Sequence, residues 1–143
     1  MKRIRRSALV PFSARQMFAL VDDVPQYPEF LPWCSDSEVL NRESNRVLAR
    51  LEVQKGAFRK SFTTTNRMEP YSGIYMVLEE GPFSSFEGNW TFEELREDAC
   101  KVELDLQFEF SNPLMSMILS PLFEDIGNTM VDAFTKRAEV VYA

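Results

Sequence analysis

Apolar and polar residues alternate with a period of two from about residue 37 to residue 110. In KVELDLQFEF, residues 101–110, every apolar side chain falls on an even position and every polar one on an odd position. Successive side chains of a strand point to opposite faces, so this pattern is typical of strands with one buried and one exposed face. Segments rich in Gly, Pro, Asn and Asp interrupt the alternation at 41–45, 56, 70–73, 81–82 and 97–98. The pattern predicts six strands joined by hairpins, preceded by a seventh at residues 2–10.

A long helix is predicted after the last strand. Asn112 and Pro113 supply an N-cap and a first-turn proline, and the helical pattern continues to about residue 141. Spacing at 100° per residue gathers an apolar stripe: Met115, Leu119, Leu122, Phe123, Ile126, Met130, Ala133 and Phe134. Arg137 lies on this stripe near its end, where it either emerges beyond the core, which we favour, or meets a carboxylate.

Two shorter segments complete the pattern. Ser13 supplies an N-cap for a short helix over about 14–21. The stretch VPQYPEFLPW, residues 24–33, carries three prolines, which limit it to one or two helical turns with protruding aromatic side chains. Such a segment resembles a lid or a wedge.

These elements predict an α+β fold: a seven-stranded antiparallel sheet wrapped around one long C-terminal helix, in a single domain covering residues 1–143. A chain of 143 residues can bury a sufficient core without metals or disulfides. The sheet and the helix then bring two apolar faces together. Pattern alone favours a filled core between them, while the aromatic content of 13% and the seven methionines leave room for a cavity that adapts to a guest.

The composition argues against ordinary catalysis. The chain has no histidine, which removes the commonest general base and the commonest zinc ligand. Cys34 and Cys100 lack metal-ligand spacing and are expected to be reduced thiols. No phosphate-binding glycine motif occurs. We therefore predict a binding protein with no catalytic residue, no metal and no required cofactor.

The charge distribution is uneven. The net charge of −6 argues against general attraction to nucleic acid. Arg3, Arg5 and Arg6 nevertheless crowd the N-terminus, and such a basic patch contacts RNA or an acidic membrane surface, or is simply a solvated strand face. No stretch is long and apolar enough to span a membrane, so we expect a cytoplasmic protein, with peripheral contact to the inner membrane as an option.

Several stretches resemble a known family. They are SALVPFSARQMFALVDDVPQYPEFLPWC (7–34), FTTTNRM (62–68), the GPF turn (81–83), the strand pair GNWTFEEL and CKVELDLQFEF, and PLFEDIGNTMVDAFTKRAEVVYA (121–143). In this order they resemble the START-like superfamily of polyketide cyclase/dehydrase and lipid transport proteins. Within it, they resemble the bacterial ribosome-association toxins and the mitochondrial coenzyme Q-binding proteins.

The resemblance implies the helix-grip fold, in which a hydrophobic tunnel separates the sheet from the helix. If such a tunnel is present, its wall residues are expected from strand parity, the alternation of strand residues between the two faces of the sheet, and from the helical stripe: Phe62, Leu78, Trp90, Phe108, Phe110, Met115, Leu119, Phe123, Ile126 and Met130. The mouth is expected near Tyr27, Phe30, Leu31 and Trp33.

The resemblance leaves the function divided. The coenzyme Q branch implies non-enzymatic binding of ubiquinone or a similar hydrophobic lipid, in support of respiration. The toxin branch implies binding to the 50S ribosomal subunit, which blocks formation of 70S ribosomes. Polyketide cyclase activity is the third alternative and lacks an identifiable proton donor here. The sequence does not indicate the oligomeric state.

Overall fold

The computed structural model describes all residues from 1 to 143 and contains seven strands, two α-helices and one 3-10 segment. The strands are β1 (Lys2–Val10), β2 (Cys34–Arg42), β3 (Arg46–Lys55), β4 (Phe58–Glu69), β5 (Gly73–Glu80), β6 (Phe83–Arg96) and β7 (Ala99–Phe110). The helical elements are α1 (Ala14–Asp22), η1 (Val24–Glu29) and α2 (Pro113–Val141). The predicted elements are therefore all present.

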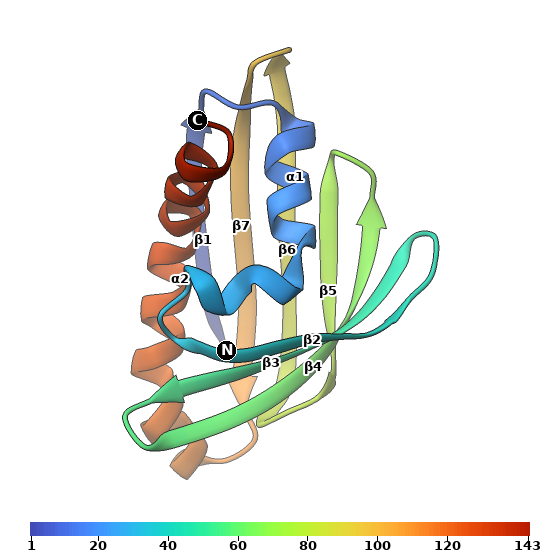
Figure 1. Cartoon of the computed structure of the whole chain (residues 1–143). Helices are drawn as coiled ribbons and strands as arrows, with labels where there is room; N and C mark the ends of the chain where they lie inside the picture. Colours follow the sequence, from blue (N-terminus) through green and yellow to red (C-terminus); the bar gives the residue numbers. More distant parts are fainter.

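The strands form one antiparallel sheet in the order β1-β7-β6-β5-β4-β3-β2. The first strand of the chain pairs with the last, from Lys2 opposite Phe108 to Val10 opposite Cys100. Figure 1 shows α2 running along β1 and β7, while β2, β3 and β4 cross the molecule at a steep angle to them. The curved sheet thus grips the long helix, and the predicted α+β helix-grip architecture is confirmed.

Local sequence signals explain where the helices begin. The Ser13 side chain accepts a hydrogen bond from the Gln16 backbone N–H, and the Gln16 side chain accepts one from the Ser13 backbone N–H. This reciprocal capping box satisfies two backbone donors at the start of α1. Asn112 caps α2 with its side chain, which accepts from the Met115 N–H at 2.9 Å.

The core lies between the inner face of the sheet and the apolar stripe of α2. Along β7 the five even-numbered residues from 102 to 110 are all buried, as the alternation predicts. Six members of the predicted helical stripe are buried: Leu119, Leu122, Phe123, Ile126, Met130 and Phe134. Met115 and Ala133 are only partly buried, whereas Gly127, Val131 and Ala138 widen the buried face.

Gly127 sets the closest approach of α2 to β1. A Cβ atom at this position would lie 2.7 Å from Ile4 Cδ1 and 3.2 Å from Ile4 Cβ. Because Ile4 is itself buried, it has little space into which to move. The absent side chain therefore allows the helix to lie against the first strand.

We expect Gly127→Leu to destabilise the protein by about 1–3 kcal/mol, because overpacking forces α2 away from β1. Urea unfolding monitored by circular dichroism measures the effect. Asn128→Leu places the same side chain on the exposed side of the helix and is expected to be near neutral. Equal stabilities for the two variants would contradict the close-packing argument.

Candidate ligand-binding cavity

An apolar cavity of about 50 Å³ lies between the sheet, η1 and α2. Thirteen of its fifteen lining residues are hydrophobic. The wall consists of Val24, Tyr27, Trp33, Ala49, Leu51, Phe62, Thr64, Asn66, Met76, Phe86, Trp90, Leu106, Phe123, Ile126 and Met130. No charged side chain reaches it.

A cluster of phenylalanines fills the space beside this cavity. Phe83 stacks on Phe110 with ring centroids 5.0 Å apart and meets Phe123 of α2 edge-on at 5.2 Å. Phe62 and Phe108 contact the same Phe123 ring at 5.8 Å and 5.9 Å. These offset and edge-to-face contacts are favourable aromatic geometries. They leave a small cavity where the resemblance implied a tunnel. The cavity has room for a few water molecules, and its volume is far below that of ordinary ligand sites, which is about 300 Å³ or more.

Half of the sequence-predicted tunnel residues line the cavity: Tyr27, Trp33, Phe62, Trp90, Phe123, Ile126 and Met130. The structure places the other half outside its wall: Phe30, Leu31, Leu78, Phe108, Phe110, Met115 and Leu119.

The residues outside the cavity have identifiable positions. Phe108 and Phe110 belong to the phenylalanine cluster, and Leu31 and Leu119 are 1% and 0% exposed in the packed core. Met115 instead borders a surface groove near the start of α2. Strand parity and the helical stripe identify the inner face correctly, but they cannot tell which of its side chains border empty space.

Sequence reasoning missed eight wall residues: Val24, Ala49, Leu51, Thr64, Asn66, Met76, Phe86 and Leu106. Most lie on inner faces that the alternation predicts. A search for apolar positions passes over Thr64 and Asn66 because they are polar. They lie two and four residues after Phe62, however, and so share its face of β4. They are the two buried polar residues of the protein, at 6% and 8% exposed.

The segment η1 and the residues after it cover the cavity. Tyr27 packs edge-on against Phe134 of α2 at 5.4 Å, and its hydroxyl donates to the Val21 carbonyl. Burial raises the pKa of this phenol, so it stays protonated at neutral pH. Arg137 binds Glu29 at 2.8 Å with its side chain only 21% exposed, so the interpretation in which it emerges beyond the core is wrong. It pins η1 to α2.

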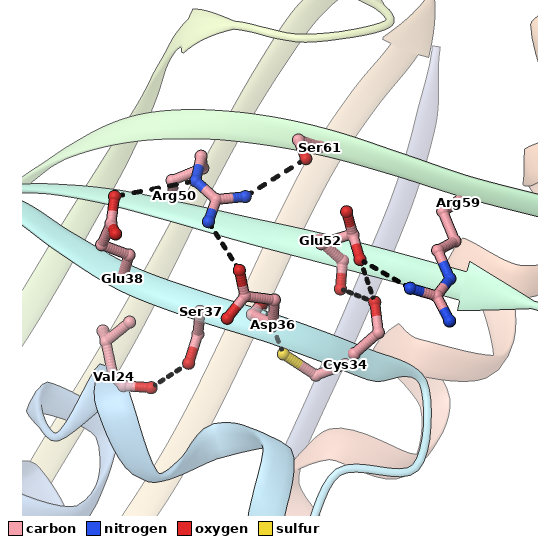
Figure 2. Close-up of polar contacts among 10 residues, drawn as sticks. Val24, Cys34, Asp36, Ser37, Glu38, Arg50, Glu52, Arg59 and Ser61 are labelled. Atoms are coloured by element: carbon pink, nitrogen blue, oxygen red, sulfur yellow. Dashed lines mark hydrogen bonds and ion pairs between the residues drawn. The ribbon is translucent and has the colours of Figure 1, made fainter.

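A polar network joins the edge strand β2 to η1 on one side and to β3 and β4 on the other, as Figure 2 shows. The Ser37 hydroxyl donates to the carbonyl of Val24 at 2.7 Å, which fixes a cavity-wall residue. Arg50 donates to Asp36 at 2.7 Å and to Ser61 at 3.3 Å, and so links β2, β3 and β4. The hydrogen bond from Arg50 lowers the pKa of Asp36.

Cys34 begins β2 directly beneath this cover. Its thiol donates to the Asp36 carbonyl at 3.3 Å, and burial raises its pKa to about 11. Cys100 is also buried, with its pKa raised to about 11 by the same cause. Both cysteines are free thiols. Because the thiolate is the reactive form, both should react slowly while the fold is closed.

The predicted basic patch divides between two faces of the sheet. Arg3 binds Asp105 through two hydrogen bonds, and Arg5 binds Glu103 at 2.8 Å, both across the β1–β7 pairing. The Arg3 guanidinium lowers the pKa of Asp105. Arg6 instead donates to the Arg5 carbonyl and has no acidic partner. Two of the three arginines are thus largely neutralised within the protein, which weakens the patch as a contact for phosphates.

The fold offers no metal centre of ordinary composition, since no three His, Cys, Asp or Glu side chains come together. None of its helices combines the length and apolar character needed to cross a bilayer. The apolar cavity also differs in character from four grooves at the surface, whose linings are half or more polar, and it is the candidate site for a small hydrophobic molecule.

A curved antiparallel sheet that grips a long C-terminal helix around an apolar cavity defines a helix-grip protein of the START-like class. The family model for polyketide cyclase/dehydrase and lipid transport proteins matches residues 10–135. The chain therefore belongs to this family, within the group that contains the ribosome association toxins and coenzyme Q-binding proteins.

Individual relatives represent both branches. The chain is 50% identical over 139 residues to the ribosome association toxin RatA of Pseudomonas aeruginosa, covering 97% of this chain and 96% of that protein. It is 32% identical to the mitochondrial coenzyme Q-binding protein COQ10 homolog B of Xenopus laevis, covering 99% of this chain and 60% of that one. A START superfamily protein from Mycobacterium smegmatis has the same fold, with a TM-score of 0.80 at 21% identity over 97% of this chain and 98% of that one.

Removal of the Ser37 hydroxyl tests how firmly the cover is held. Ser37→Ala leaves the Val24 carbonyl without its partner, at a cost of about 1 kcal/mol, and this should raise the population of open cover about fivefold. Alkylation of Cys34 at pH 8, followed by peptide mass spectrometry, is expected to accelerate by that factor. Cys100 lies on β7, five strands away from β2 in the sheet, and serves as the internal reference. Equal acceleration at both thiols would indicate global unfolding instead.

Proposed function

We propose that this protein binds ubiquinone or a similar hydrophobic lipid in the cavity between the sheet and α2, and that it performs no covalent chemistry. The observation that carries the proposal is the apolar wall of the cavity, which is built from η1, the strands β3 to β7 and the long helix. A related protein bears the name of a coenzyme Q-binding protein. Burial of an isoprenoid chain contributes about 25 cal/mol per Å² of apolar area removed from water.

The cavity must expand to receive such a guest. Met76 and Met130 line it, and their unbranched, polarisable side chains change rotamer at low cost. The cover formed by η1 is held by the polar contacts of Ser37 and Arg137 and by the packing of Tyr27 against Phe134. None of these is a backbone pairing of the sheet, so the cover can open without separating its strands. We therefore place ligand access beneath η1, at the mouth expected from the sequence.

A binding role without catalysis agrees with the chemistry of the wall. Tyr27 is the only ionisable residue in it, and its hydroxyl is already committed to the Val21 carbonyl. No residue there is ready to move a proton at neutral pH, so cyclisation of a polyketide ranks last. A protein that carries quinone must also reach the membrane in which quinone dissolves, so the proposal includes peripheral contact with the inner membrane from the cytoplasm, in support of respiration.

The two tryptophans of the chain, Trp33 and Trp90, both line the cavity and report on its occupation. Titration with a short-tailed ubiquinone is expected to quench their fluorescence to saturation, and organic extracts of the purified protein should contain quinone or lipid. Ala49→Leu fills the cavity and is expected to weaken binding by about tenfold or more. Ala57→Leu, in the exposed β3–β4 turn, is the matched control.

The quinone proposal fails if extracts are empty and added quinone causes no saturable quenching. It also fails if Ala49→Leu, folded by circular dichroism, binds as tightly as the control variant. In that case the quenching would arise at the surface.

Association with the 50S ribosomal subunit, which would block formation of 70S ribosomes, is the second candidate. The name of the 50% identical relative favours it. Three arginines without acidic partners also lie around the hairpin of β4 and β5. Arg15 stacks on Tyr71 in its turn at 4.3 Å, Arg67 stacks on Tyr75 at 4.8 Å, and Arg46 lies opposite Arg67 in the sheet. Arginine and tyrosine side chains are suited to RNA phosphates and unstacked bases.

Sucrose gradients test the second candidate. Added protein is expected to lower the 70S peak and to sediment with 50S particles. The double variant Arg15→Glu/Arg67→Glu should lose this association, because RNA contacts depend on unpaired positive charge. The double variant Lys60→Glu/Lys136→Glu changes the charge equally at exposed positions, with Lys60 at the opposite end of β4 from Arg67, and should retain it. An unchanged 70S peak with wild-type protein would refute ribosome association, and equal losses in both variants would refute this contact surface.

A further inference from the structure

Two polar residues lie side by side in the otherwise apolar wall of the cavity. Thr64 and Asn66 are two positions apart on the inner face of β4, a strand within the sheet. Their sheet neighbours include Ala49 and Met76, which also line the cavity. The pair therefore lies in the middle of the inner wall.

The Asn66 amide is only half satisfied. The Thr64 hydroxyl donates to Asn66 Oδ1 at 2.7 Å, and this is the one side-chain hydrogen bond that either residue makes. Ser85 Oγ is the only fully enclosed polar side-chain atom without a partner, so the unpaired Asn66 Nδ2 must border accessible space. Because Asn66 lines the cavity, its two N–H donors are available to a molecule inside it.

An unused donor in an apolar wall is costly to the protein, since burial of a polar group without a partner is unfavourable. A guest oxygen would remove that cost. A carboxylate or phosphate would find one amide but no cation, because no Lys or Arg lines the cavity. A pure hydrocarbon would leave the amide unpaired. The wall therefore favours a guest that is neutral, apolar and equipped with an acceptor oxygen.

We infer that the Thr64–Asn66 pair is the recognition point for a carbonyl oxygen of the ligand, with Asn66 Nδ2 as the donor. Thr64 positions the amide by holding its oxygen. The ligand class is a neutral carbonyl-bearing molecule, such as a quinone, and excludes free fatty acids. This inference rests on the proposed binding of a hydrophobic ligand, and it assigns the head-group end of the guest to β4.

The side chain of Met76 borders the pair from the neighbouring strand β5. Met76 lies opposite Asn66 in the β4–β5 pairing and is only partly buried. Its flexible thioether can withdraw as a ring enters, which would enlarge the cavity beside the amide. The phenylalanine cluster at the other side stays fixed by its mutual contacts and limits how far the head group can travel.

The test compares three probes by tryptophan quenching and competition: a short-tailed 1,4-benzoquinone, the alkylbenzene that lacks both carbonyl oxygens, and a fatty acid of equal length. Wild-type protein should bind the quinone about tenfold more tightly than the alkylbenzene, and more tightly than the fatty acid. Asn66→Leu should remove this tenfold preference while leaving alkylbenzene affinity unchanged or improved. Thr64→Val should reduce it in part.

Each outcome is decisive. If Asn66→Leu weakens quinone and alkylbenzene equally, the residue is structural and the inference is wrong. If the variant keeps the quinone preference, the amide holds only water and the inference is again wrong. A fatty acid that binds as tightly as the quinone would overturn the assigned ligand class. If wild-type protein binds no probe, the proposed function itself has failed, and this result is distinct from the others.

The thermal midpoint of the variants separates recognition from folding. Replacement of both members of the pair, Thr64→Val with Asn66→Leu, removes the unpaired amide without leaving the buried Thr64 hydroxyl unpaired, and it is expected to leave stability unchanged or slightly higher. A loss of stability comparable to that of a core deletion would show that the amide supports the fold instead. Thr63→Val changes the preceding residue, which points to the outer face of β4 and makes no side-chain hydrogen bond, and serves as the control for altered strand propensity.

Discussion

Aromatic packing between the inner face of the sheet and α2 is the constraint on which the rest of this structure depends. Phe83, Phe110 and Phe123 meet in offset and edge-to-face contacts that fix the separation of helix and sheet at one side. At the other side, η1 and Trp33 cover the space that remains. The cavity is the space between the curved sheet and α2 that these aromatic rings do not fill. Its size follows from ring geometry and not from any charged or catalytic group.

The sheet edge opposite β1 is organised differently. At the β1 edge, Gly127 lets the helix lie close against the strand, and ion pairs across β1 and β7 use the N-terminal arginines internally. At the β2 edge, hydrogen bonds from Ser37 and Arg50 hold the cover in place. Apolar packing is hard to rearrange, whereas a few exposed polar contacts are not. In the proposed function the cover opens at the β2 edge, while the backbone pairing of β1 with β7 and the close packing at Gly127 keep the β1 edge closed.

Much of the site could be predicted from sequence because strand parity is a local property. The alternation along the strands and the helical stripe correctly place Trp90, Phe123 and Met130 on inner faces. The same patterns also place Phe108 and Leu119 there, and these prove to be packed core. Periodicity reports which face a side chain occupies. It carries no information about whether a partner from a distant element fills the space in front of it.

The sequence by itself determined the seven strands, the two α-helices and the antiparallel order of hairpins, because turn residues and periodicity act over a few residues. Its lack of histidine also limited the chemistry. Only the tertiary structure decided that the expected tunnel is a small cavity, that Arg137 meets Glu29, and that Arg3 and Arg5 are paired with β7. Those outcomes depend on contacts between segments as much as 108 residues apart. The same reason explains the polar pair in β4: Thr64 and Asn66 are ordinary strand residues in the sequence and become significant only where an apolar wall surrounds them.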